Sequence, residues 1–165
     1  MKQKLIIAGL IVAGLASITY AALTQSLVIT GTASTTTDWD VKITGVMATA
    51  LNGATVTAAP TFTNTSATFA VNLDHPGATA DFEVTVANTG TIDAILDSIS
   101  GVDTANTAVP LGIQYEVIGL DTHSALTAGN AATATVRVVW DSAATLDAHQ
   151  TKTATITFNY VQDTL

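Results

Sequence analysis

The sequence predicts an all-β protein: an antiparallel sandwich of the jelly-roll or immunoglobulin-like kind with a protruding N-terminal donor strand. After residue 22 the chain is rich in Thr, Val, Ile and Ala, contains only three Pro, and alternates apolar and polar residues with period 2 in one segment after another. Turn sequences containing Gly or Asn separate these segments. About eight or nine strands without a long 3.6-residue periodicity imply two sheets packed face to face.

Composition limits the classes to which the protein can belong. The chain has 165 residues, of which 48% are hydrophobic and 11% are charged, and it has no Cys. This favours one folded domain with a core and excludes both disorder and a disulfide scaffold. The 13 acidic residues against 5 basic ones give a net charge of −8. A nucleic-acid partner is not expected, because phosphate binding needs a surface of Lys and Arg.

Residues 1–21 have the pattern of a signal peptide. Lys2 and Lys4 form a positive start, an apolar run follows over 5–16, and small residues around Ala21 match a cleavage site. We expect cleavage after Ala21, a secreted protein, and contact with the membrane only transiently through this segment. The alternative is a retained anchor, because the run of low polarity through Leu23 covers roughly 19 residues, enough to span a bilayer.

Residues 22–37 are predicted to form a strand, Ala22–Ala33, followed by a polar hinge. One face of this strand carries Leu23, Gln25, Leu27, Ile29, Gly31 and Ala33. Fully extended, its 12 residues reach about 40 Å. The strand either pairs within its own domain or adds to the sheet of a neighbouring copy. The second arrangement would generate a filament when each copy passes the contact on to the next.

Residues 38–165 are assigned to the sandwich domain. Trp39 and Trp140 each end an alternating apolar face, so both are expected in the core. Asp93–Ile99 and Leu146–Lys152 have some helical character. The alternating segments that we expect to be half-buried strands are Trp39–Ile43, Phe69–Leu73, Phe82–Val86, Ile113–Val117, Val136–Trp140 and Ala154–Tyr160.

Several of these segments resemble a known family. The leader Lys4-Leu-Ile-Ile-Ala-Gly-Leu-Ile-Val-Ala-Gly-Leu, the Thr19-Tyr20-Ala21 site, the arm ending in Gly31-Thr-Ala, and the hairpin Phe82-Glu-Val-Thr-Val-Ala-Asn-Thr-Gly-Thr-Ile-Asp93 are similar to those of the camelysin and TasA family. Its members are secreted fibre subunits of the biofilm matrix, with relatives among archaeal bundling pili. The chain departs from the family in having Ala22-Leu23 where an aromatic pair is common, and in its lower charge content.

The resemblance implies a jelly-roll subunit that polymerises by donating its N-terminal strand to the next copy. The expected function is therefore a structural subunit of an extracellular filament or pilus, in a biofilm matrix or in cell–cell contact, and the expected partner is the chain itself. The alternative is a monomeric surface adhesin or carbohydrate-binding module. The aromatic content of 5% disfavours it, because sugar platforms use several exposed rings.

The sequence lacks the motifs of common hydrolases, so no enzymatic activity is expected, although some members of the family carry a metallopeptidase label. The His-Glu-x-x-His motif is absent, since His75, His123 and His149 are far apart and neither Glu adjoins a His. Gly-x-Ser-x-Gly is also absent, and without Cys there is no thiol nucleophile.

No cofactor is expected, and two kinds of minor site remain as candidates. Asn64-Thr65-Ser66 matches the N-glycosylation sequence in a polar turn, so Asn64 is a candidate for modification. Calcium, which takes hard oxygen ligands, is a weaker candidate than solvated carboxylates on turns and strand ends. The carboxylates concerned are Asp38, Asp40, Asp93, Asp97 and Asp103.

Overall fold

The computed structural model describes residues 32, 37–144 and 152–163. The contacts of the chain divide it into Met1–Thr35 and Thr36–Leu165, and the fold below is that of the second unit. The expected signal peptide lies outside the described residues, as does the expected donor strand apart from Thr32.

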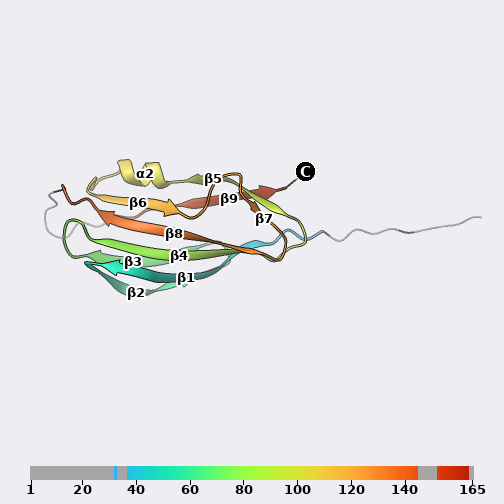
Figure 1. The fold of residues 1–165 in the computed structure, drawn as a ribbon, viewed down its shortest axis with the longest axis horizontal. Helices are drawn as coiled ribbons and strands as arrows, with labels where there is room; N and C mark the ends of the chain where they lie inside the picture. The colour runs from blue at the N-terminus through green and yellow to red at the C-terminus, as the bar shows by residue number, and fades with distance from the viewer. Residues whose placement is uncertain (1–31, 33–36, 145–151, 164–165) are drawn as a thin grey trace, which may run out of the picture. The chain divides into compact units, whose positions relative to one another are not determined.

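The second unit is all-β with antiparallel strand pairing, as the sequence predicted (Figure 1). Within the described residues the chain forms nine strands and one short helix. In chain order these are β1 Val41–Asn52, β2 Ala54–Phe62, β3 Ala67–Leu73, β4 Thr79–Asn88, β5 Ala94–Ser100, α2 Val102–Thr107, β6 Ile113–Ile118, β7 Ala125–Leu126, β8 Ala131–Trp140 and β9 Thr157–Gln162.

The first layer is a four-stranded sheet in the order β1-β4-β8-β6. Its two central strands alternate strictly: every second residue of β4 is buried, and Ala134, Val136 and Val138 of β8 are buried in the same way. Period-2 burial places one side of each strand on the core, so the alternating sequence fixes the register of the sheet. Burial of a side chain such as Phe82, which is fully enclosed, contributes about 1.5–3 kcal/mol.

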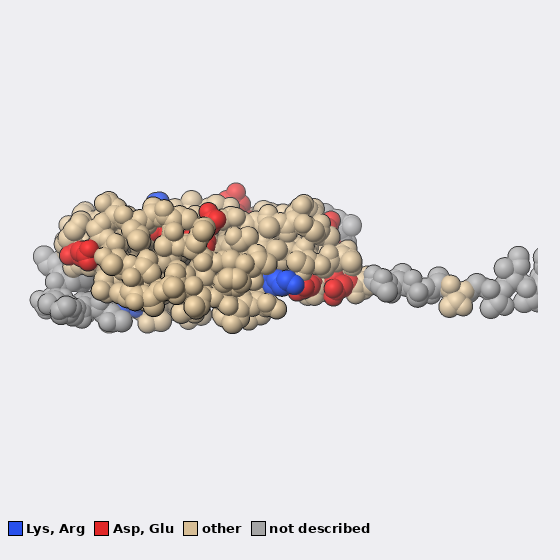
Figure 2. Space-filling view, turned by 90° about the horizontal axis from the view of Figure 1, so that it is seen from below, with Lys and Arg blue, Asp and Glu red and all other residues tan. Residues whose placement is uncertain are grey.

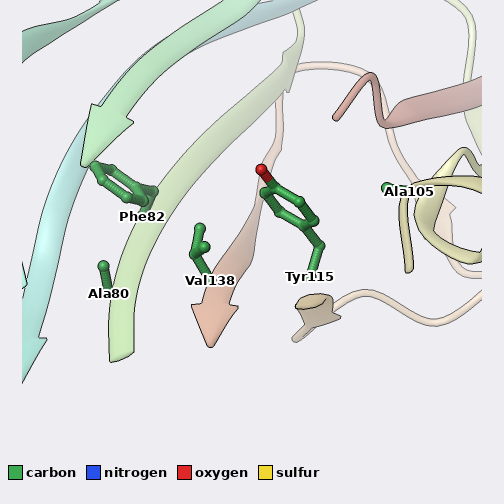
Figure 3. Packing of buried hydrophobic residues seen from close by; sticks show 5 residues of the cluster. All are labelled: Ala80, Phe82, Ala105, Tyr115 and Val138. Atoms are coloured by element: carbon green, nitrogen blue, oxygen red, sulfur yellow. The ribbon is translucent and has the colours of Figure 1, made fainter. Parts of the chain in front are cut away.

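The second layer consists of the β2-β3 hairpin and a three-stranded sheet in the order β7-β5-β9. Both pieces pack on the same face of the first layer, where Figure 3 shows Phe82, Val138 and Tyr115 side by side. Phe69 of β3 stacks on Phe82 with ring centroids 4.0 Å apart and an interplanar angle of 15°. The core therefore lies between one continuous sheet and two separate ones.

Two of the turns require glycine. Gly53 has φ 60° and connects β1 in the first layer to β2 in the second. Gly101 has φ 93°, and a Cβ placed there would lie 1.9 Å from the Thr155 carbonyl oxygen. Other residues rarely adopt such φ values, so the sequence correctly marked both positions as turns.

The helical expectation for Asp93–Ile99 was wrong. This segment contains β5, whose residues Ala94 and Leu96 are fully buried and whose partners are β7 and β9. Burial at every second position overrides a weak local helical preference. The helix instead follows as α2, and Leu146–Lys152 lies outside the described residues except for its last member.

The unit has two ends, which we name by the residues found there. At the Asn88 end, β4 stops and the Asn88 N–H donates to the Asn130 carbonyl, at 2.9 Å, just before β8 begins. At the Trp140 end, β8 stops and the Trp140 carbonyl accepts the Gly77 N–H at 2.8 Å, just before β4 begins.

The Asn88 side chain organises its end of the unit. It is almost completely buried, and its Nδ2 donates to the carbonyls of Ile92 at 2.8 Å and Leu126 at 2.9 Å. Its Oδ1 accepts the Gly90 N–H at 3.1 Å. One amide thus joins the β4–β5 turn to β7.

We expect Asn88→Ala to lower the free energy of unfolding by about 2–4 kcal/mol, because buried backbone groups that lose their partners retain the cost of desolvation. Urea unfolding of the variant and of the exposed control Asn72→Ala measures this. The control should change by less than about 0.5 kcal/mol. Equal losses in both variants would contradict the assigned role of the Asn88 amide.

One cross-strand ion pair lies on the outer face of the first layer. The Arg137 guanidinium on β8 donates to the facing Asp81 carboxylate on β4 at 2.7 and 2.9 Å. These hydrogen bonds hold the pKa of Asp81 below its usual value. A carboxyl with a lowered folded-state pKa stabilises the fold above its unfolded pKa, and this stability is lost as the pH falls through the folded value.

We expect Arg137→Ala to cost about 1 kcal/mol at neutral pH, a modest value because Arg137 is more than a third exposed. The difference from the original protein should shrink as the pH falls through the lowered folded-state pKa of Asp81, and it should disappear once Asp81 is protonated in both folded states. Urea unfolding over a series of pH values from neutral into acid measures it. A difference that persists in acid would assign the loss to packing of the Arg137 stem rather than to charge.

Candidate functional site

The main candidate site is a groove in the second layer. β3 pairs with β2, β9 pairs with β5, and no strand among the described residues pairs with the opposite edge of either. Between these two edges lies a cavity of about 1220 Å³. Strand edges of this kind present unpaired backbone N–H and C=O groups that another strand can use.

The first layer forms an apolar floor beneath the groove. The walls are β3 on one side and residues 152–160 on the other. The floor is made by inward-facing residues of the three strands β4, β6 and β8, namely Val84, Val86, Ile113, Tyr115, Val136, Val138 and Trp140. Protein interiors are normally close-packed, so a space of this size marks a place where the layer is incomplete.

The two walls run in opposite directions. The turn before β3 lies at the Asn88 end, where the Asn64 carbonyl accepts the N–H of Ile43 at 2.8 Å. β9 finishes at that same end, because Tyr160 packs in the cluster that contains Val86. The arrows of β3 and β9 accordingly point in opposite directions in Figure 1. A strand placed between them would be parallel to one wall and antiparallel to the other.

Bulky and polar groups concentrate at the Trp140 end of the groove. Burial raises the pKa of Tyr115, whose hydroxyl donates to the Lys152 carbonyl at 3.0 Å. The Lys152 ammonium donates to the carbonyls of Pro110 at 3.1 Å and Ile113 at 2.6 Å, and its desolvation lowers its pKa. These bonds tie the wall before β9 to the start of β6.

The indole of Trp140 has a hydrogen-bond donor for which the described residues provide no acceptor. Its indole Nε1 is buried and finds no hydrogen-bond partner among the residues that the structure describes. Trp140 lines the groove, and a buried N–H left without a partner costs about 1–3 kcal/mol.

The six arm residues of the sequence prediction, Leu23, Gln25, Leu27, Ile29, Gly31 and Ala33, lie outside the described residues. The prediction that Trp39 packs in the core was wrong, since 43% of its surface is exposed. β1 begins at Val41, so Trp39 precedes the alternating face that it was expected to extend.

The glycosylation candidate is accessible. Asn64 is exposed in the turn between β2 and β3, where the Thr63 and Ser66 hydroxyls are 2.7 Å apart and the Ser66 N–H donates to Thr63 Oγ1 at 3.1 Å. Asn64 also lines the groove at its Asn88 end. A glycan at this position would therefore stand at the mouth of the groove.

The carboxylates that were candidates for calcium binding are already hydrogen-bonded or belong to different elements of the fold. Asp40 accepts hydrogen bonds from Lys42 at 2.7 Å and from Thr89, and these bonds hold its pKa below the usual value. Asp93 accepts the Ala128 N–H at 2.7 Å. Asp38 precedes β1, Asp97 lies on β5 and Asp103 lies in α2. Within 37–144 and 152–163, no three His, Asp or Glu side chains come together as a metal site.

Sequence patterns located the walls of the groove but not the groove itself. The alternation of Phe69–Leu73 and Ala154–Tyr160 identified inward-facing residues of β3 and of the wall before β9. The separation of these two strands depends on pairings between distant segments, β2 with β3 and β5 with β9. No local signal in the sequence reports such pairings.

In the part of the chain that the structure describes, no helix is long and apolar enough to span a bilayer. The chain matches no protein-family model, no curated protein and no solved structure.

Proposed function

We propose that the protein is the structural subunit of an extracellular filament, polymerised head to tail by donation of the Ala22–Ala33 strand to the next copy. The observation that carries this proposal is the groove between β3 and β9, with its apolar floor and its two unpaired strand edges. In this proposal the protein acts by assembly, with no catalytic step and no cofactor.

The size of the groove favours a peptide segment as its occupant. Small-molecule sites typically enclose about 300–1,000 Å³, whereas this cavity is larger and extends along β3. The seven residues of β3 span about 23 Å, and a 12-residue arm reaches about 40 Å. The arm is thus long enough to fill the groove and still connect to its own body.

The chemistry of the arm suits the floor and the walls. Burial of Leu23, Leu27 and Ile29 would contribute about 1.5–3 kcal/mol each. Backbone hydrogen bonds to the two edges would add about 0.5–1.5 kcal/mol each, and ordering the arm would cost about 1–2 kcal/mol per residue. These terms are similar in size, so the deciding contribution would be backbone pairing at the two strand edges, which have no strand partner among the described residues.

The inserted strand would complete the second layer. Its strand order would become β2-β3-arm-β9-β5-β7, a continuous six-stranded sheet facing the first layer. That arrangement corresponds to the two-sheet jelly-roll sandwich that the sequence favours. Because the two walls run in opposite directions, the arm would be parallel to one wall and antiparallel to the other in either orientation.

The surface suits a homopolymer outside the cell better than a nucleic-acid partner. Figure 2 shows one face on which uncharged side chains predominate and charged ones are scattered. The cations of the described residues already have partners: Lys42 bonds Asp40, Arg137 bonds Asp81, and Lys152 bonds backbone carbonyls. The signal-peptide pattern of residues 1–21 supports secretion and only transient contact with a membrane.

Deletion of Ala22–Ala33, with residues 1–21 kept for export, should abolish filaments in electron micrographs. A synthetic peptide of residues 22–33 should then bind the truncated protein and raise its free energy of unfolding, by about 2.7 kcal/mol at 100 times the Kd. A scrambled peptide is the control. Filaments from the truncated protein would refute strand donation. An intact protein that stays monomeric, and that the deletion only destabilises, would show that the arm fills its own groove.

A second test exploits the two faces of the arm. Ile29→Asp places a carboxylate on the face that would meet the apolar floor, whereas Thr30→Asp places the same charge on the opposite face. Because an unpaired buried charge is strongly disfavoured, we expect Ile29→Asp to reduce polymer yield at least about tenfold and Thr30→Asp to have little effect. Sedimentation of polymer at equal protein concentrations measures both. Equal yields would contradict a donated strand with this face inward.

A further inference from the structure

We propose that the filament joint contains a second contact, in which Trp39 of the donating copy packs against the exposed loop Val109–Leu111 of the accepting copy. This inference rests on the proposed strand donation and adds to it the surface through which the two bodies meet. The argument uses the position of Trp39, the position of the loop, and the direction in which a propagating arm must enter the groove.

Trp39 is held rigidly at the Asn88 end. The Asp38 N–H donates to Thr91 Oγ1 at 2.9 Å, and the Thr91 N–H donates to the Asp38 carbonyl at 2.9 Å. On the other side of Trp39, the Asp40 carbonyl accepts the Thr89 N–H at 2.8 Å. Both neighbours of Trp39 are therefore fixed on the β4–β5 turn, while 43% of its own surface is exposed to solvent.

The loop lies at the opposite end, beside the mouth of the groove. Val109 is 83% exposed and Leu111 is 60% exposed, more than the other exposed large hydrophobic residues of the described chain. The carbonyl of Pro110, between them, accepts a hydrogen bond from Lys152, which lines the groove. The next residue, Gly112, accepts the N–H of Asp141 just after β8. Val109 and Leu111 thus form the exposed apolar patch that the proposed contact would cover.

The direction of entry follows from propagation. The arm joins its own body at Asp38, which lies at the Asn88 end. If the arm entered its neighbour at the neighbour's Asn88 end, two equivalent ends would meet, and such a contact is self-complementary and closes into a dimer. Entry at the Trp140 end joins unlike ends of two copies, so copies can be added to the chain of subunits indefinitely. The donated strand then runs parallel to β3 and antiparallel to β9.

This direction brings the two apolar patches together. With Ala33 at the mouth of the groove, Trp39 follows six positions further along the chain, a reach of at most about 21 Å. The Asn88 end of one body, which carries Trp39, then faces the Trp140 end of the next body, which carries Val109–Leu111. So small a contact would not hold two free proteins together, but an inserted arm gives it an effective concentration in the mM range.

Disulfide trapping in filaments tests the contact, since the chain has no Cys of its own. A chain carrying Trp39→Cys and Leu111→Cys should oxidise into a ladder of covalent oligomers on denaturing gels. The matched control carries Met47→Cys and Leu111→Cys, because Met47 is 56% exposed but lies in the middle of β1. We expect cross-linking at least about tenfold faster than in the control.

The outcomes of this experiment distinguish a failure of the proposed contact from a failure of strand donation. Filaments that form but give no ladder above the control would overturn the contact and leave donation intact. Wild-type protein that forms no filaments would refute donation, and the contact with it. If the double variant does not polymerise, the same measurement with Thr37→Cys and Val109→Cys, which keeps Trp39 and Leu111, decides in the same way. Covalent dimers from Trp39→Cys alone would show that like ends meet, which also overturns the inference.

Discussion

The backbone edges of β3 and β9, which have no strand partner among the described residues, are the constraint on which the proposed function depends. The first layer is complete by itself, because β4 and β8 have partners on both sides. The second layer is divided, and the floor beneath the gap is apolar. We propose that a strand fills this gap, because a strand can both pair with the two backbone edges and cover the apolar floor. In this proposal the shape of the body specifies the chemistry of its partner.

In the proposed strand donation, the arm would fill the groove through its alternating pattern more than through any single residue. Alternation gives it one apolar face for the floor, and its length exceeds that of the groove. Strand donation differs in this respect from recognition by a few dominant side chains, because affinity comes mainly from the backbone and alternate side chains supply specificity.

The sequence predicted the all-β class and many of the strands because their signals are local. Alternation in β4 and β8 and the glycines at positions 53 and 101 can be recognised without knowledge of the rest of the chain. β5 was missed because its short run resembles a helix until β7 and β9 bury it. Trp39 was misplaced because periodicity cannot show where a strand begins. The groove, which depends on pairings between distant strands, had no local signal.

The anchoring of Asp38 and Asp40 on the β4–β5 turn has a mechanical consequence. Tension carried along the chain from residue 37 would enter the body next to β4, the strand that pairs with β1 on one side and β8 on the other. In the proposed filament, a pull along the strand axis would load the hydrogen bonds of these two ladders in shear instead of opening them one after another. A body connected in this way would transmit force along the proposed filament without unravelling from its attachment point.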